Sequence, residues 1–507
     1  MRSLRRRSKR ARLGVDVWGA LHLVGALVKY LSVAFILPFG VALGYGEPAW
    51  PFLAAAAITA AGGQGLEFFT KGKHSIGARE GFLVVSLTWL FGALFMSLPY
   101  LFVEPQLRNP FDAYFEAMSG MTTTGSSMLT DIPALSHSIA IWRQFTAWLG
   151  GMGIIVLALA VLPRLRVGGR QLMESEAPGP ELEPLATSIR DTARRLWLLY
   201  VGLTILMIFV LSMIAWTGLD SRMSFYEAVA HAFSTMPTAG FSTRARSIEE
   251  FGAASQWAIA AFMIIAGMNF ALLYFALVRG HLRKAVHDEE LRLYMALLGV
   301  ATLLIFIDLS AEGIEAGAAA FRHAAFQTAS IMTTTGLAST DFNLWTPLTA
   351  LVLVLLMFIG GSAGSTAGAI KVVRILLTAR IMRRELDHTV HREAVLPIRL
   401  NGRVIDERTL RAVSVFVLLY LVAFALGALI LVIDGARGAV DVSPFEAISA
   451  AATTLGNVGP GFGFLGPMGS FEPFSNFSTV VMTMLMWMGR LELLPIVVLL
   501  TRSYWRA

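Results

Sequence analysis

Apolar residues along this chain gather in runs of about bilayer length, and polar residues gather in the intervals between the runs. A helix that crosses a bilayer needs about 20 mostly apolar residues. The pattern therefore predicts an all-α polytopic membrane protein. Ten membrane helices are expected, near residues 21–44, 49–69, 80–103, 139–162, 196–217, 256–279, 291–310, 348–376, 412–433 and 477–501.

A short phrase that ends in glycine returns four times in the intervals between these runs. Successive glycines lie 115, 96 and 123 residues apart, so the repeating unit has the size of a membrane module rather than of a solenoid turn. The four glycine phrases are Met121-Thr-Thr-Thr-Gly125, Met236-Pro-Thr-Ala-Gly240, Met332-Thr-Thr-Thr-Gly336 and Leu455-Gly-Asn-Val-Gly459.

An eight-residue amphipathic stretch begins 14 residues before each of these glycines. Such stretches are too short to cross a membrane, and we interpret them as re-entrant pore helices whose negative C-terminal ends favour a cation. Asp112, Glu227 and Glu446 suit the positive starts of three pore helices, whereas the third copy carries Arg322 and His323 there. The four stretches are residues 111–118, 226–233, 322–329 and 445–452.

Each glycine phrase therefore belongs to a unit with the order helix, pore helix, loop, helix. All four units run in the same direction, which predicts a parallel repeat of four modules around a central pore and not an inverted repeat. Two further helices precede the repeat. The expected division is a basic tail at 1–20, two accessory helices at 21–79, and pore modules at 80–195, 196–290, 291–411 and 412–507.

Composition and charge agree with a membrane protein. Of 507 residues, 56% are hydrophobic and 15% are charged, where a soluble protein has about a quarter charged residues. With the N-terminus inside, the expected cytoplasmic segments hold 32 of the 41 Lys and Arg residues, so both termini are expected in the cytoplasm. Seven of them lie in residues 2–12, where we favour a membrane anchor over a nucleic-acid patch. We therefore expect no nucleic-acid partner.

The glycine phrases suit the chemistry of a potassium filter. A potassium ion must exchange its hydration shell for protein oxygens, and rings of backbone carbonyls supply them. Glycine permits the dihedral angles that turn successive carbonyls inward. A single phrase of this kind would be a plain turn, but four in register favour the filter interpretation.

These motifs resemble the Trk/Ktr/HKT superfamily of cation transporters, and the two extra N-terminal helices resemble its TrkH/TrkG-like branch. The resemblance implies potassium uptake across the bacterial cytoplasmic membrane, with potassium as the transported ion at a filter made by the glycine phrases. A sodium-permeable or sodium/proton-coupled transporter of the same fold is the alternative. Pro237 in the second copy and Gly456-Asn-Val in the fourth depart from the threonine pattern. The residues expected to bind the ion are Thr123, Thr124, Gly125, Thr238, Ala239, Gly240, Thr334, Thr335, Gly336, Asn457, Val458 and Gly459.

A second feature interrupts the eighth predicted helix. Residues 359–368 are so small and glycine-rich that a stable helix is not expected there. Close helix packing is one interpretation, and a flexible intramembrane gate, which the resemblance implies, is the other. The expected gate residues are Gly360, Gly361, Gly364 and Gly368, with Lys371 at the cytoplasmic end.

Arg490 is the third feature. A charge inside a membrane helix costs roughly 3 kcal/mol and usually faces a cavity or a partner. Glu492 is two positions away and does not share a helix face with Arg490. We favour a role in the pore, where the resemblance implies a barrier to cations when the gate is closed. Asn269 is interpreted as a packing or boundary residue.

Partners are indicated by the basic segment 371–411, which holds ten Lys and Arg residues. The resemblance implies a homodimer and a cytosolic nucleotide-binding subunit of the TrkA type, while anionic membrane lipid explains the charge equally well. No phosphate-binding fingerprint occurs in a strand–helix context, so this chain is not expected to bind nucleotide itself. No catalytic dyad recurs on apposed helices, and we expect no enzyme activity.

Overall fold

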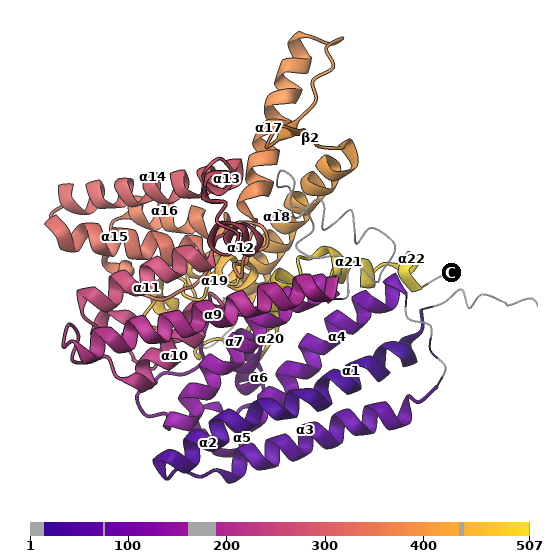
Figure 1. Ribbon diagram of the computed structural model, residues 1–507, viewed down its shortest axis with the longest axis vertical. Coiled ribbons are helices and arrows are strands. Elements are labelled where there is room, and N and C mark those ends of the chain that lie inside the picture. The colour runs from indigo at the N-terminus through magenta and orange to yellow at the C-terminus, as the bar shows by residue number, and fades with distance from the viewer. Residues whose placement is uncertain (1–14, 73, 75–76, 161–188, 436–440, 506–507) are drawn as a thin grey trace, which may run out of the picture.

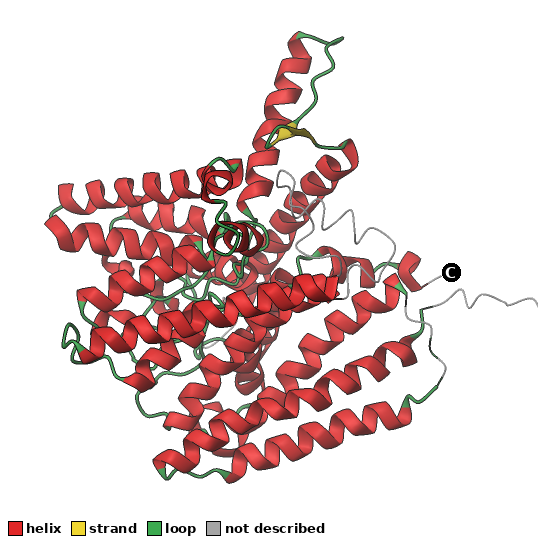
Figure 2. Cartoon of the chain, in the orientation of Figure 1, coloured by secondary structure: helices red, strands yellow, loops and turns green. Residues whose placement is uncertain are grey.

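The computed structural model describes residues 15–160 except 73, 75 and 76, and then residues 189–435 and 441–505. Most of the basic tail predicted at 1–20, and most of the interval between the spans predicted at 139–162 and 196–217, lie outside the described residues. The described chain is a packed array of helices, and its two strands form one small hairpin (Figure 2). The all-α prediction is confirmed.

Six helical stretches in the described part of the chain are long and apolar enough to cross a membrane, or seven if one bent pair counts as a span. Their outward faces carry large apolar side chains such as Phe209, Leu303 and Leu418, each more than half exposed. Such faces suit lipid rather than water. The chain is a multi-pass membrane protein. The six stretches are Val17–Tyr45, Trp50–Phe69, Arg79–Val103, Asp191–Trp216, Glu289–Ala311 and Glu407–Gly435.

The elements follow the predicted order along the chain, as the colours of Figure 1 show. The accessory region holds α1 (Val17–Leu31), η1 (Ser32–Phe35), α2 (Ile36–Tyr45) and α3 (Trp50–Phe69). The first two predicted modules hold α4 (Ala78–Met96), α5 (Leu98–Val103), η2 (Pro105–Leu107), α6 (Pro110–Met121), α7 (His137–Ala160), α9 (Ile189–Trp216), α10 (Phe225–Thr235), η4 (Ser247–Glu250), α11 (Ala253–Ala266), α12 (Phe270–Leu277) and α13 (Leu282–Val286).

The last two predicted modules are arranged in the same way. They hold α14 (Glu289–Ala311), α15 (Gly317–Met332), η5 (Phe342–Leu344), α16 (Pro347–Met357), α17 (Val372–Val390), β1 (Arg399–Leu400), β2 (Arg403–Val404), α18 (Glu407–Gly435), α19 (Pro444–Gly456), η6 (Gly463–Leu465), α20 (Asn476–Arg490), α21 (Leu494–Leu499) and α22 (Arg502–Trp505). In Figure 1, α17 and the hairpin stand out from the body of the molecule. The division into domains itself stays a prediction.

The third pore helix begins earlier than the repeat pattern predicts. Helix α15 starts at Gly317, five residues before Arg322, so Arg322 lies in its second turn and not at its positive end. The Arg322 Nε donates to the Gln256 Oε1 at 2.8 Å, and the His323 Nδ1 lies 2.8 Å from the Ser339 Oγ. The charge mismatch suggested by the third copy is therefore absent.

Two predicted spans prove to be broken helices. The span expected at 256–279 bends by 106° between α11 and α12. The span expected at 477–501 stops at Arg490 and resumes at Leu494, and Glu492 and Leu493 between them have positive φ (+59° and +53°). The interruption predicted in the span 348–376 is present, because no helix covers residues 358–371.

Candidate ion pathway

The four glycine phrases share one backbone conformation. The residue two places before each glycine has a positive φ, which is 54° at Thr123, 58° at Thr238, 57° at Thr334 and 53° at Asn457. Each glycine also has a positive φ, which is 86° at Gly125, 77° at Gly240, 78° at Gly336 and 111° at Gly459. The backbone repeat is therefore four-fold, although the side chains divide into two similar and two divergent copies.

The same hydrogen bond closes each pore helix. The amide of the residue before the glycine donates to the carbonyl of the serine or threonine that lies six places before the glycine. These pairs are Thr124 to Ser119 at 2.8 Å, Ala239 to Ser234 at 2.9 Å, Thr335 to Ser330 at 2.8 Å and Val458 to Thr453 at 2.9 Å. This bond turns the chain sharply out of the helix and fixes where the next carbonyls lie.

The four glycines form a closed ring. A Cβ atom added at Gly125 would lie 2.2 Å from the carbonyl oxygen of Ala239, and one at Gly240 would lie 2.3 Å from that of Thr335. One at Gly336 would lie 2.1 Å from the Val458 oxygen, and one at Gly459 would lie 2.8 Å from the Thr124 oxygen. Each glycine therefore packs against the carbonyl that precedes the next glycine, and the fourth phrase returns to the first.

One small cavity, with a volume of about 50 Å³, lies against this ring and is bordered by the segments that follow its glycines. All four glycines, at positions 125, 240, 336 and 459, line it. A cavity of this volume can hold at least one occupant the size of water. We call this space the glycine cavity.

Side chains around the ring differ between the copies. The hydroxyl oxygens of Thr122 and Thr124 lie 2.8 Å apart, and those of Thr333 and Thr335 lie 2.7 Å apart. In the fourth copy, the Asn457 Nδ2 instead donates to the Thr124 Oγ1 at 3.0 Å and to the Met486 carbonyl at 2.9 Å. Asparagine tolerates the left-handed conformation better than most residues, so this departure from threonine keeps the backbone of the repeat.

Two arginines also line the glycine cavity, and each is paired with a glutamate of a pore helix. The Arg143 Nε lies 2.8 Å from the Glu116 Oε1, with both side chains buried. The Arg244 Nη2 lies 2.9 Å from the Glu227 Oε1. Because each positive charge has a carboxylate beside it, neither arginine presents an uncompensated charge to a cation in the cavity.

Residues 358–371 form a loop, here called the intramembrane loop, that lies against the pore-helix ends. The Gly368 amide donates to the Thr334 Oγ1 at 2.8 Å, and the Thr366 Oγ1 donates to the Met236 carbonyl at 3.1 Å. A Cβ added at Gly368 would lie 2.4 Å from the Gly456 carbonyl oxygen. The loop thus contacts the second, third and fourth glycine phrases.

The other glycines of the loop permit its path. Gly360 and Gly364 have φ of +75° and +70°, which side chains rarely allow. A Cβ added at Gly361 would lie 2.8 Å from the Gly267 carbonyl oxygen. These predicted gate residues therefore hold a compact non-helical loop against the broken helix of the second module.

The two basic residues predicted for the gate both donate to this loop. The Arg490 Nη1 donates to the Thr366 carbonyl at 2.7 Å, and the Lys371 Nζ donates to the Ala367 carbonyl at 2.6 Å. Arg490 is buried, and its Nε and Nη2 atoms have no hydrogen-bond partner among the described residues. Glu492 lies instead beside Arg374, with the Nη2 and Oε2 atoms 2.5 Å apart.

The family of the chain follows from comparisons with known proteins. The family model described as the cation transport protein TrkH matches residues 51–506. The chain belongs to the TrkH cation transport protein family. Its ring of glycine phrases and its intramembrane loop are therefore features of a TrkH-family membrane protein, and the resemblance inferred from the sequence is confirmed.

Individual relatives agree with this family. The Trk system potassium uptake protein TrkH of Escherichia coli strain K12 is 36% identical over 492 residues, which cover 96% of this chain and 98% of the relative. The Trk system potassium uptake protein TrkG of the same strain is 32% identical over 494 residues, which cover 96% and 98%. The crystal structure of the potassium transporter TrkH from Vibrio parahaemolyticus matches with a TM-score of 0.85 and 34% identity, covering 97% of this chain and 100% of that one.

Three polar residues of this TrkH-family chain were not expected to serve the site. Thr366 joins the intramembrane loop to the second glycine phrase and to Arg490. Asn269 caps α12 through hydrogen bonds from the Ala271 and Leu272 amides, and so stabilises the break beside the loop. Glu290 accepts from the amide of loop residue Ala363. A polar residue inside an apolar run is the signal that could have identified Asn269.

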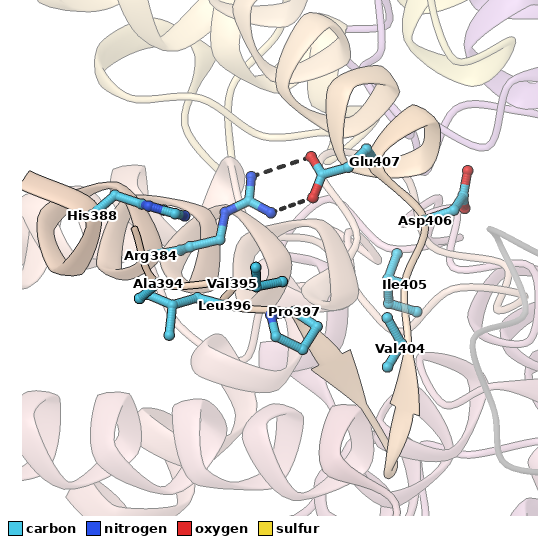
Figure 3. Close-up of a pocket in the computed structure, with 10 residues that line it drawn as sticks. All are labelled: Arg384, His388, Ala394, Val395, Leu396, Pro397, Val404, Ile405, Asp406 and Glu407. Carbon is cyan, nitrogen blue, oxygen red and sulfur yellow. Dashed lines mark hydrogen bonds and ion pairs between the residues drawn. The ribbon is translucent and has the colours of Figure 1, made fainter. Parts of the chain in front are cut away.

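A second cavity is lined by other residues than the glycine ring. It lies in the basic segment 371–411, here called the basic extension. It has a volume of about 440 Å³ and is lined mainly by apolar side chains of the hairpin region, with Arg384, His388, Asp406 and Glu407 at its edge. Figure 3 shows the ion pair between Arg384 and Glu407 at the edge of this cavity. Its apolar walls do not suit a cation, and it lies outside the candidate pathway.

Proposed function

We propose that this protein takes up potassium through a gated, channel-like pore whose filter is the ring of glycine phrases. The observation that carries the proposal is the closed ring itself, in which each filter glycine packs against the carbonyl that precedes the next. The potassium transport named for the relatives in Escherichia coli and Vibrio parahaemolyticus supports the choice of ion. Neutral carbonyl dipoles bind a dehydrated cation without trapping it.

The filter is proposed to consist of the three residues that end each phrase. The carbonyls of Thr124, Ala239, Thr335 and Val458 are the ones that approach the neighbouring glycines, which supports their place around the ion. Arg143 and Arg244 lie at the same cavity and are neutralised by their glutamates, so that the carbonyls dominate the local field.

The intramembrane loop is proposed as the gate, with Arg490 as a positive charge that opposes cations in the closed state. Three glycine phrases touch the loop, and the Nε and Nη2 atoms of buried Arg490, which have no hydrogen-bond partner among the described residues, support an uncompensated positive charge at this point. Arg490→Gln should remove this charge and raise rubidium flux several-fold into proteoliposomes that contain the purified protein. Unchanged or lower flux, with normal folding, would count against the gate.

Sodium permeation is the alternative to be excluded. Fluxes of rubidium and of sodium into proteoliposomes, each measured with the other ion absent, decide between the two. The proposal expects rubidium flux at least tenfold above sodium flux. Equal fluxes would favour the sodium-permeable alternative, and a rubidium flux that needs a sodium or proton gradient would favour coupled transport.

We further propose that the protein works as a homodimer in the bacterial cytoplasmic membrane, with both termini in the cytoplasm, and docks a cytosolic nucleotide-binding subunit of the TrkA type. The excess of Lys and Arg in the basic extension supports a cytoplasmic docking surface. Light scattering of the purified protein in detergent, with and without such a subunit, tests both points. A monomer, or a mixture that does not associate, would refute the corresponding part.

A further inference from the structure

Glu290 is buried at the start of α14 and joins the middle of the intramembrane loop to the first turn of α17. Its Oε1 accepts from the Ala363 amide at 2.6 Å and from the Val373 amide at 3.3 Å. Only 4% of Glu290 is exposed. Val373 lies in the first turn of α17, where amides lack helical partners and a carboxylate is favoured. One oxygen therefore ties the loop to the helix that follows it.

The two residues before Glu290 hold the turn of the hairpin in the basic extension. The Asp288 Oδ2 accepts from the Asn401 Nδ2 at 2.8 Å. The Glu289 amide donates to the Asn401 Oδ1 at 2.9 Å, and the Asn401 amide donates to the Glu289 Oε1 at 3.1 Å. Asn401 and Gly402, both with positive φ, form the two-residue turn between β1 and β2.

Three consecutive acidic residues thus connect two elements that are distant in sequence. Asp288 and Glu289 contact the hairpin, and Glu290 contacts the intramembrane loop. All three lie at the start of one helix, whose Asp288 N-cap fixes its first turn. The hairpin and the intramembrane loop are therefore joined through a single helical turn.

We propose that Glu290 is the positioning residue that holds the intramembrane loop closed, and that the first turn of α14 couples the basic extension to this loop. The inference rests on the proposed function, because it takes the loop as the gate. It adds the residue that sets the position of the loop and the surface through which a bound partner acts on it.

Rubidium flux in proteoliposomes tests the coupling. Glu290→Ala should raise the flux about tenfold, which corresponds to about 1.4 kcal/mol in the closed-to-open ratio. Glu290→Gln, which keeps one acceptor oxygen, should raise it less. Both variants should keep the ratio of rubidium to sodium flux, because the filter is untouched. A gain of flux distinguishes this role from a structural one, since misfolding lowers flux.

Asn401→Gly tests the hairpin end of the connection. Glycine keeps the left-handed turn and removes the side-chain contacts with Asp288 and Glu289. Asn401→Gly should also raise rubidium flux. The double variant Glu290→Ala/Asn401→Gly should raise the flux by less than the product of the two single increases. Glu393→Gln is the matched control, since Glu393 is exposed in the same extension. If the flux of the double variant rises by the full product of the two single increases, the two sites act independently and the coupling is refuted.

Accessibility of the loop gives a second measurement. The chain has no cysteine, so Ser362→Cys places a single thiol on the loop, at a side chain whose hydroxyl has no partner among the described residues. A water-soluble thiol reagent should modify this cysteine faster in the Glu290→Ala background. If Arg490→Gln raises flux while the Glu290 variants change neither flux nor accessibility, the positioning role of Glu290 is refuted and the gate stands. If no variant raises flux, the gate itself fails.

Discussion

At the residue scale, the site depends on conformations that only a few residue types permit. Threonine at Thr123, Thr238 and Thr334 has a positive φ, which is uncommon for a β-branched residue. Such strain costs about 1–3 kcal/mol per residue and persists where the surrounding structure compensates for it. The glycines beside them were identifiable from the sequence, whereas the strained threonines were not, because sequence does not report φ.

Gly336→Ser should weaken the filter. Its Cβ would meet the Val458 carbonyl oxygen at 2.1 Å, in a backbone conformation that side chains disfavour. We expect rubidium flux to fall at least tenfold and the ratio of rubidium to sodium flux to fall with it. Gly202→Ser, on an exposed face of α9 with open space around it, is the matched control and should preserve both. A normal flux ratio in Gly336→Ser would contradict the filter assignment.

Glu116→Gln should destabilise the fold around the glycine cavity. Breaking a buried ion pair from one side costs about 3–5 kcal/mol, because the remaining charge is left uncompensated. Thermal unfolding in detergent should therefore start at a lower temperature than in the natural protein. The double variant Glu116→Gln/Arg143→Met should unfold at a higher temperature than Glu116→Gln alone, because no buried charge is left uncompensated. If the double variant is less stable than Glu116→Gln, charge compensation is not the cause.

At the element scale, three helices that follow glycine phrases are interrupted. Helices α11 and α12 are separated at Gly267–Asn269, α16 and α17 at the intramembrane loop, and α20 and α21 at residues 491–493. The glycine-rich loop was predicted because ten small residues disfavour a helix. The other two breaks escaped prediction, because Asn269 stands alone in an otherwise apolar run and Glu492 shares such a run only with Arg490. Tertiary contacts, such as the Phe270 amide donating to the Gly364 carbonyl at 3.1 Å, favour the interruption.

Glu47 joins the accessory helices to α7. Its carboxylate accepts from the amides of His137 and Ser138, at 2.7 and 2.8 Å, in the first turn of α7. Burial alone would raise the pKa of Glu47, but the hydrogen bonds from Ser138 and His137 outweigh it and lower the pKa below its ordinary value. The stability that the ionised Glu47 carboxylate gives to the fold is therefore fully present at neutral pH. It is lost as the pH falls through the lowered pKa.

Glu47→Gln tests this contact by its dependence on pH. The variant should unfold at a lower temperature than the natural protein at pH 7, and the difference should shrink in acid, where the natural carboxylate is protonated. Glu472→Gln, at an exposed side chain, should show no such difference at either pH. If the difference in unfolding temperature between Glu47→Gln and the natural protein does not change with pH, the charge of Glu47 does not contribute to stability.

At the scale of the whole molecule, the candidate ion site exists only when four distant segments meet. The glycines at 125, 240, 336 and 459 are separated by whole modules and lie around one cavity. A ligand that binds only the folded state stabilises it, by about 2.7 kcal/mol at one hundred times its Kd. The ion should therefore stabilise the entire fold rather than one loop.

Potassium should accordingly raise the thermal unfolding temperature of the purified protein above its value in choline at equal ionic strength. The increase should be lost in Gly336→Ser and kept in Gly202→Ser. An equal increase with sodium would favour the sodium-permeable alternative. The absence of any increase with potassium, at concentrations well above those that saturate transport, would contradict an ion site in the glycine cavity.

The sequence by itself determined the helical membrane class, the four glycine phrases and the non-helical loop, because these follow from local composition and period. Arg490 and Lys371 were identifiable because a charge in an apolar run needs a partner or a cavity. Only the tertiary structure decided that the glycines close into a ring, that Arg490 donates to Thr366, and that Glu290 and Asn401 connect the loop to the hairpin. These contacts join residues up to several hundred positions apart, and no local pattern encodes which distant carbonyl or carboxylate will face a given group.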